Sequence, residues 1–129
     1  MKVYFNTNGT IKNIPTDDTR FFQNSGNDQE LILYGIPEGE DVMVTFTRSD
    51  RVKYGPYLAD YDYDDNEVLV VKLLMPPEAF EVAGGVRISI LAQHEAEEEI
   101  GGIMTTKLVR HAYAKVGITV YENDAVVVL

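Results

Sequence analysis

Cysteine is absent from this chain of 129 residues. Its absence excludes disulfides, cysteine-ligated zinc sites and thiol nucleophiles, so the fold must be held together by its hydrophobic core. A chain of this length is expected to bury about two thirds of the surface that its unfolded form exposes. We therefore predict a single domain spanning residues 1–129, with no internal repeat and no linker.

Long apolar runs are missing as well. The first residues, Met-Lys-Val-Tyr-Phe-Asn, include no apolar segment of the kind found in signal peptides. No window approaches the roughly 18 apolar residues that a membrane span requires. We expect a soluble protein made in the cytosol, with no membrane partner.

Basic residues are few. Lysine and arginine number 11 against 21 aspartates and glutamates, which gives a formal net charge of −10. This charge repels a phosphate backbone, and no stripe of basic residues interleaved with aromatic ones offsets it. Nucleic-acid binding is therefore not expected.

The chain does contain repeated alternation of apolar and polar residues with a period of two, which is typical of β-strands. Residues 67–93 are the strongest example, because a proline-containing turn joins two such runs there. The first run, residues 67–74, is apolar on both faces and predicts a central strand covered on both sides. The second predicts a strand with one face in the core, made of Val86, Ile88, Ile90 and Ala92.

The remaining alternating segments indicate the overall fold. Residues 1–15 are predicted to form an N-terminal hairpin around Asn8-Gly9, a pair that suits a type I′ turn. Residues 18–121 form the core of a sandwich, and residues 122–129 a C-terminal strand. About nine strand candidates separated by turn clusters predict an all-β fold, an Ig-like antiparallel β-sandwich with additional terminal hairpins.

Four segments are predicted to lie outside regular strands. Residues 51–58 are typical of an irregular tyrosine-rich edge, because a Gly-Pro pair interrupts them. Residues 60–66 are predicted to form an acidic turn, and residues 75–80 have room for at most one helical turn. Residues 94–102 are predicted to form a charged loop, since they offer no apolar face and end in two glycines.

One acidic motif is similar to a calcium site. Asp60, Asp62 and Asp64 have the alternate spacing with which a calcium loop begins. The positions of the glycine and the bidentate glutamate of such a loop are taken by Asp65 and Val71. We therefore expect a solvated acidic turn.

The two histidines are the other candidates for chemistry. His94 and Glu98 are four residues apart, but Glu98 stands where the second histidine of a His-Glu-x-x-His zinc pattern would be. His111 lies in a predicted strand with no Ser, Cys or Asp partner fixed by the sequence. We expect no catalytic residue, no metal, no cofactor and no enzymatic activity.

Tyrosines gather in one segment, at Tyr54, Tyr57, Tyr61 and Tyr63. Such a cluster suits a stacking platform for sugars or a protein interface, because tyrosine gives contact area at low entropic cost. The same residues equally suit the edge of a sandwich, since tyrosine is favoured in strands. A carbohydrate-binding module is therefore the alternative function.

The chain ends in five consecutive apolar residues. Left as an exposed edge strand, such a run would recruit other chains through its unpaired backbone groups. We predict that it packs between copies in a homo-oligomer or continues into a further segment. The residues of this interface are Ala125, Val126, Val127, Val128 and Leu129.

Four segments carry a family resemblance: RFFQNSGNDQELILYGI (residues 20–36), VMVTFTRSD (42–50), VLVVKLLMP (68–76) and GGVRISILAQ (84–93). Together they resemble the N-terminal domain of upper baseplate and tail-fibre proteins from phages of Gram-positive bacteria. The similarity covers about residues 18–121. The chain departs from that family in its additional N-terminal hairpin and in stopping at Leu129, where the family usually continues into a linker, coiled coil or receptor-binding head.

The resemblance implies a non-enzymatic phage or prophage structural protein, a baseplate or tail-fibre attachment module that acts by protein–protein assembly. Its expected partners are other virion proteins and copies of itself, with a trimer favoured. Its expected location is the virion, after synthesis in the bacterial cytoplasm.

Overall fold

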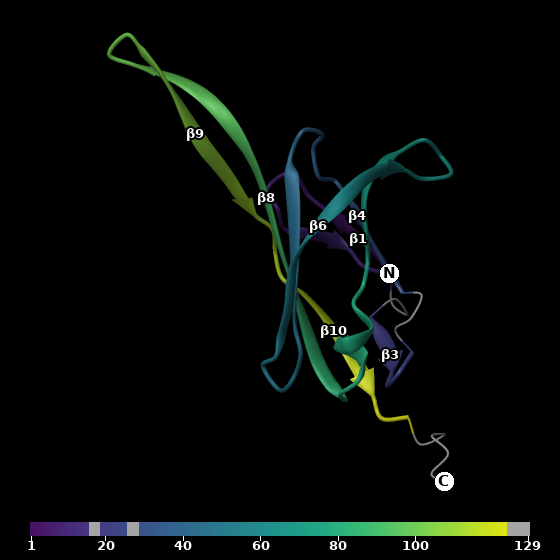
Figure 1. The fold of residues 1–129 in the computed structure, drawn as a ribbon. Helices are drawn as coiled ribbons and strands as arrows, with labels where there is room; N and C mark the ends of the chain where they lie inside the picture. The colour runs from purple at the N-terminus through teal and green to yellow at the C-terminus, as the bar shows by residue number, and fades with distance from the viewer. Residues whose placement is uncertain (16–18, 26–28, 124–129) are drawn as a thin grey trace.

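A computed structural model describes residues 1–15, 19–25 and 29–123. The described residues form ten β-strands and one short 3-10 helix, so the prediction of an all-β fold is confirmed (Figure 1). The 3-10 helix, Pro77–Phe80, matches the single helical turn for which residues 75–80 were predicted to have room.

The ten strands are joined in one curled sheet with the order β2-β1-β4-β7-β6-β5-β8-β10-β3, and β9 pairs with β8 off this path. Their bounds in chain order are β1 Lys2–Phe5, β2 Ile11–Asn13, β3 Arg20–Phe22, β4 Glu30–Tyr34, β5 Asp41–Thr47, β6 Lys53–Tyr63, β7 Leu69–Leu74, β8 Gly84–Ile100, β9 Ile103–Ala112 and β10 Val116–Tyr121.

The sheet is mixed, which corrects the expectation of a purely antiparallel fold. β1 runs parallel to β4, with Val3 opposite Leu33, and β10 runs parallel to β3, with Val120 opposite Phe21. Both parallel pairs join segments that are far apart along the chain, which local alternation does not reveal. The specific features of an Ig-like sandwich are not confirmed.

The predicted pattern of β7 and β8 is largely confirmed. β7 lies between β4 and β6, and Val70 and Val71 are buried on its two faces, although Leu74 at its end is 61% exposed. The apolar face of β8 is buried as expected and packs with the other strands in one core. This core includes Val3, Leu31, Leu33, Val42, Val44, Phe46, Val71, Phe80, Val86, Ile88, Ile90, Ala92, Val116, Ile118 and Val120.

β6 explains how the sheet curls, and it corrects two expectations. Its first part pairs with β5 and its last residues, 60–63, pair with β7, so the strand belongs to both parts of the sheet. The predicted tyrosine-rich edge is therefore an interior strand. Its pairing with β5 shifts register near Gly55, whose φ is +108°, and a Cβ there would lie 2.7 Å from the Val44 carbonyl oxygen.

The predicted acidic turn is shorter than residues 60–66. Asp60 to Tyr63 belong to β6, and the turn to β7 begins at Asp64. The Asp64 Oδ1 atom accepts hydrogen bonds from the backbone N–H groups of Asn66 and Val68, both at 2.9 Å. An aspartate therefore fixes this turn through its own side chain.

β8 and β9 form a long two-stranded ribbon, so the predicted charged loop at residues 94–102 is wrong. The two strands pair from Leu91 with Ala112 to Ile100 with Ile103. Gly101 and Gly102 have φ values of +58° and +80°, the left-handed pair that a tight hairpin turn requires. We call residues 94–109 the arm, because Figure 1 shows this ribbon extending away from the remaining strands.

The N-terminal hairpin is confirmed, since β1 and β2 pair antiparallel. Its turn differs from the expected type I′, because Gly9 has a φ of +86° whereas Asn8 does not have a positive φ. The predicted C-terminal strand begins with Glu122 and Asn123, which are not in a strand. The rest of that prediction lies outside the described residues.

Candidate functional site

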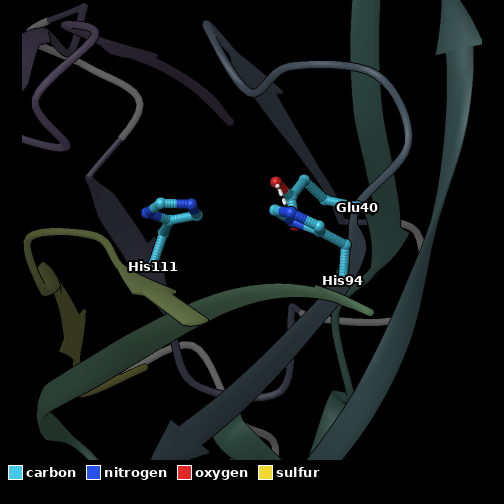
Figure 2. Close-up of side chains that lie close together, drawn as sticks. All are labelled: Glu40, His94 and His111. Carbon is cyan, nitrogen blue, oxygen red and sulfur yellow. Dashed lines mark hydrogen bonds and ion pairs between the residues drawn. The ribbon is translucent and has the colours of Figure 1, made fainter. Parts of the chain in front are cut away.

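Three ionisable side chains meet at the base of the arm. Antiparallel pairing of β5 with β8 places Asp41 opposite Gln93, so Glu40, one residue earlier, comes beside His94. On the other side of β8, Ala92 lies opposite His111 of β9. The register of three strands thus brings Glu40, His94 and His111 together (Figure 2).

The contacts within this cluster are short. Both carboxylate oxygens of Glu40 lie 2.9 Å from the Nδ1 atom of His94. The imidazole rings of His94 and His111 are nearly parallel, with centroids 6.1 Å apart and 26° between their planes. One ligand atom from each residue lies within 4.8 Å of the others. The arrangement can hold a proton or a metal ion.

Burial differs across the cluster. The side chain of Glu40 is only 9% exposed, whereas that of His94 is 37% exposed. His111 is exposed on β9. A nearly buried carboxylate is costly unless it is paired, so His94 is a required partner of Glu40 in this fold.

Tyr61 fixes the backbone that carries Glu40. Its hydroxyl donates to the Pro37 carbonyl oxygen at 2.6 Å and accepts from the Glu40 backbone N–H at 3.1 Å. Burial raises the pKa of Tyr61, and the negative charges of Glu40, Asp41 and Glu38 raise it further. The surroundings of the cluster are therefore acidic.

A pocket of about 370 Å³ opens beside the cluster. The turn of the N-terminal hairpin forms one wall, and it is fixed there because the Ala114 backbone N–H donates to the Gly9 carbonyl oxygen at 2.8 Å. A Cβ at Gly9 would lie 3.2 Å from the Ala112 carbonyl oxygen. The pocket is lined by Thr7, Asn8, Gly9, Pro37, Glu40, Arg110, His111, Ala112 and Tyr113.

Both histidines were considered from the sequence, but no partner was predicted for either of them. Glu98 does not join His94: its carboxylate lies 3.6 Å from the Lys107 Nζ atom on the arm. The actual carboxylate partner is Glu40, which is 54 residues away from His94. Spacing along the chain could not reveal it, because the contact depends on the register between β5 and β8.

The three aspartates of the calcium-like motif are placed along β6 and its following turn. Asp62 lies 3.5 Å from the Lys72 Nζ atom. Asp64 holds the turn and also accepts a hydrogen bond from the Tyr34 hydroxyl at 3.0 Å. Asp60 is exposed. Two of the three carboxylates therefore have partners within the protein.

The four tyrosines do not share one environment. The Arg48 guanidinium lies 5.5 Å from the ring centroid of Tyr54, and Tyr57 lies beside Phe46 with centroids 6.3 Å apart. Tyr54, Tyr57 and Tyr61 pack against the core, whereas Tyr63 is 58% exposed. Their role as a ligand platform stays a prediction.

The arm is the second candidate site. Its end carries exposed apolar side chains: Ile100 is 59%, Ile103 67% and Met104 59% exposed. Ile100 and Ile103 lie directly opposite each other and therefore share one face of the ribbon. The interface predicted at residues 125–129 lies outside the described residues.

No protein-family model matches the sequence, and no curated protein matches it either. None of the described residues belongs to a helix long and apolar enough to cross a membrane.

Proposed function

We propose that the protein is a non-enzymatic structural component of a phage or prophage virion, a baseplate or tail-fibre attachment module that acts by associating with other proteins. Its first partners are copies of the same chain, with a trimer favoured by the family resemblance. The observation that carries the proposal is the arm, a two-stranded ribbon that extends from the body and bears exposed apolar residues at its end.

An isolated two-stranded ribbon is at best marginally stable in water. Among the described strands, β9 pairs with β8 alone, so its other edge offers backbone groups for pairing. Such an edge is a template for association with another chain. A partner that covers the arm would stabilise it, which is a physical reason for the arm to be an assembly element.

Copies of the same chain are the partner that the apolar end of the arm favours. Arms that meet near a symmetry axis of the oligomer would bring Ile100 and Ile103 of one copy against those of another. Burying an isoleucine completely contributes about 1.5–3 kcal/mol. Burial of a few such residues from each copy would therefore supply a sizeable part of the free energy that holds an interface together.

The carbohydrate-binding alternative has less support. A stacking platform needs aromatic faces open to a ligand, and three of the four clustered tyrosines pack against the core. The Tyr61 hydroxyl is also engaged by the backbone of Pro37 and Glu40.

Light scattering on the intact chain tests the proposal. We expect an oligomer for the natural sequence and a monomer for the double variant Ile100→Lys/Ile103→Lys, with unchanged circular dichroism because both side chains lie outside the core. The control is Asn13→Lys/Thr119→Lys, which adds the same charge at two exposed strand positions outside the arm and should remain oligomeric. A monomer for the natural chain would refute self-association, and an oligomer for the isoleucine variant would refute the role of the arm.

A further inference from the structure

We infer that Glu40, His94 and His111 bind a divalent first-row transition-metal ion such as Zn²⁺, with three protein ligands and one position open to the pocket. This site differs from the expectation, drawn from the sequence, that the protein binds no metal. This inference is independent of the proposed assembly function, because metal binding can be measured whether or not the chain associates with other copies.

The donor set determines the class of ion. Two imidazole nitrogens and one carboxylate suit Zn²⁺ and its neighbours, whereas Ca²⁺ and Mg²⁺ prefer sites made of oxygen ligands. Two histidines and one glutamate with a fourth position left to water is a combination that zinc adopts in proteins. The chain has no cysteine, so no thiolate competes for the ion.

The distances allow such a site with small side-chain movements. Bonds of about 2.0–2.2 Å in a tetrahedron place neighbouring ligand atoms about 3.3–3.6 Å apart. The Glu40 oxygens and the His94 Nδ1 atom are 2.9 Å apart, and all three ligand atoms fall within 4.8 Å. Rotation of the exposed His111 side chain is the main adjustment that binding requires.

The burial of Glu40 supports a cation at this point. Its side chain is 9% exposed, and both carboxylate oxygens approach the single Nδ1 atom of His94 at the same distance. One N–H group can direct its hydrogen at only one oxygen at a time. A metal ion in place of that proton would bind both the partly buried carboxylate and the imidazole.

The charges around the site favour a cation on balance. Glu38 and Asp41 flank Glu40 along the chain, and the whole chain has a formal net charge of −10. Arg110 is the opposing group, since it also lines the pocket. The Tyr61 hydroxyl orients the Glu40 backbone from outside the ligand set, as supporting hydrogen bonds do in metal sites.

The consequence of binding is mechanical. The three ligands come from the turn before β5, from β8 and from β9, which are the segments that meet where the arm leaves the body. An ion shared by all three would fix the direction of the arm relative to the body.

Titration of the untagged, chelator-treated protein with Zn²⁺ in a calorimeter tests the site, with Co²⁺ absorption as a report of ligand geometry. We expect one ion per chain and a tetrahedral-type visible spectrum for Co²⁺. His111→Ala should weaken the affinity at least about tenfold and should fold normally, because His111 is exposed. His94→Asn tests the second ligand, although it removes the partner of a buried carboxylate.

Glu38→Gln is the matched control, because it removes a neighbouring exposed carboxylate and leaves the three ligands intact. Its affinity should stay within a few-fold of the natural chain. The inference is overturned if Zn²⁺ binds at less than one ion per chain, or if His111→Ala binds as tightly as the natural chain. Equal losses of Zn²⁺ affinity in His111→Ala and Glu38→Gln would also overturn the inference, because they would indicate a diffuse attraction of cations to acidic residues.

Discussion

At the scale of single residues, a buried tyrosine links the stability of the fold to alkaline pH. Burial, together with the hydrogen bond to the Asp64 carboxylate and its negative charge, raises the pKa of Tyr34 from 10.0 to about 12. Below pH 10 both the folded and the unfolded chain keep the phenol proton. Between these two pKa values only the unfolded chain loses it, so the free energy of unfolding falls as pH rises.

Tyr34→Phe should therefore give a shallower loss of stability over that pH range. Urea unfolding at neutral pH and at several alkaline pH values measures the difference. The variant should start about 1 kcal/mol lower at neutral pH, because it loses one hydrogen bond, so the slopes and not the absolute values are compared. Parallel curves for the two proteins would contradict the role assigned to Tyr34, while Tyr63→Phe, at an exposed position, should follow the natural chain.

The residues of the candidate metal site show what a sequence can reveal at this scale. Both histidines stand out because the chain has only two. Glu40 does not stand out among 21 acidic residues, and its contact with His94 arises only when β5 and β8 align. The residue types that suit a site can therefore be recognised from the sequence, whereas the strand register decides which of these residues meet in the fold.

At the scale of elements, the arm is a separate addition to the body. It contributes exposed residues beyond position 96, so its removal should leave the core intact. Replacing residues 96–107 with Asn-Gly would connect Glu95 to Leu108 through a two-residue turn, and these two residues already face each other in the ribbon. A two-residue Asn-Gly turn suits such a hairpin.

We expect this shortened chain to be folded and monomeric, with a melting temperature close to that of the intact chain at protein concentrations where both are monomers. Differential scanning calorimetry measures it, and the circular dichroism spectrum checks the strand content. A shortened chain that fails to fold would show that the arm is part of the folding unit and not a separate addition to the body.

The arm also shows why one element was missed. A strand was predicted for residues 103–113, and β9 confirms it, but the half of the ribbon before the turn was predicted as a loop. Prediction of strands from alternation requires a buried face, and residues 95–100 are mostly exposed. The signal that remained was Gly101-Gly102, a pair that favours hairpin turns. In contrast, β8 up to Ala92 and β10 were predictable, because each buries every second residue.

At the scale of the whole molecule, strand content was predictable but topology was only partly so. Alternation indicates that a segment is a strand, and it does not name the partner strand. The parallel pairs β1 with β4 and β3 with β10 bring together distant segments, and they turn the expected sandwich into a mixed, curled sheet. Curling also depends on β6 changing partners, from β5 up to Ala59 to β7 from Asp60 onward, which alternation does not reveal.

The charge of the whole molecule gives a prediction about assembly. Each chain has a formal net charge of −10, so copies repel one another at low ionic strength. Salt at about 0.15 M reduces the screening length to about 8 Å. Because the proposed contact at the end of the arm is apolar, sedimentation velocity should show more oligomer as salt increases. Dissociation with increasing salt would instead indicate a contact held by ion pairs.

Hydrogen exchange of the arm at different protein concentrations tests the central claim, that the arm associates with other copies, most directly. Peptides from residues 94–109 are compared with peptides from β5, whose backbone is paired on both sides within the body. We predict that the arm exchanges quickly in dilute protein and becomes protected in concentrated protein, while β5 is protected equally in both. Arm exchange that is independent of concentration, in a chain that light scattering shows to be monomeric throughout, would contradict the account.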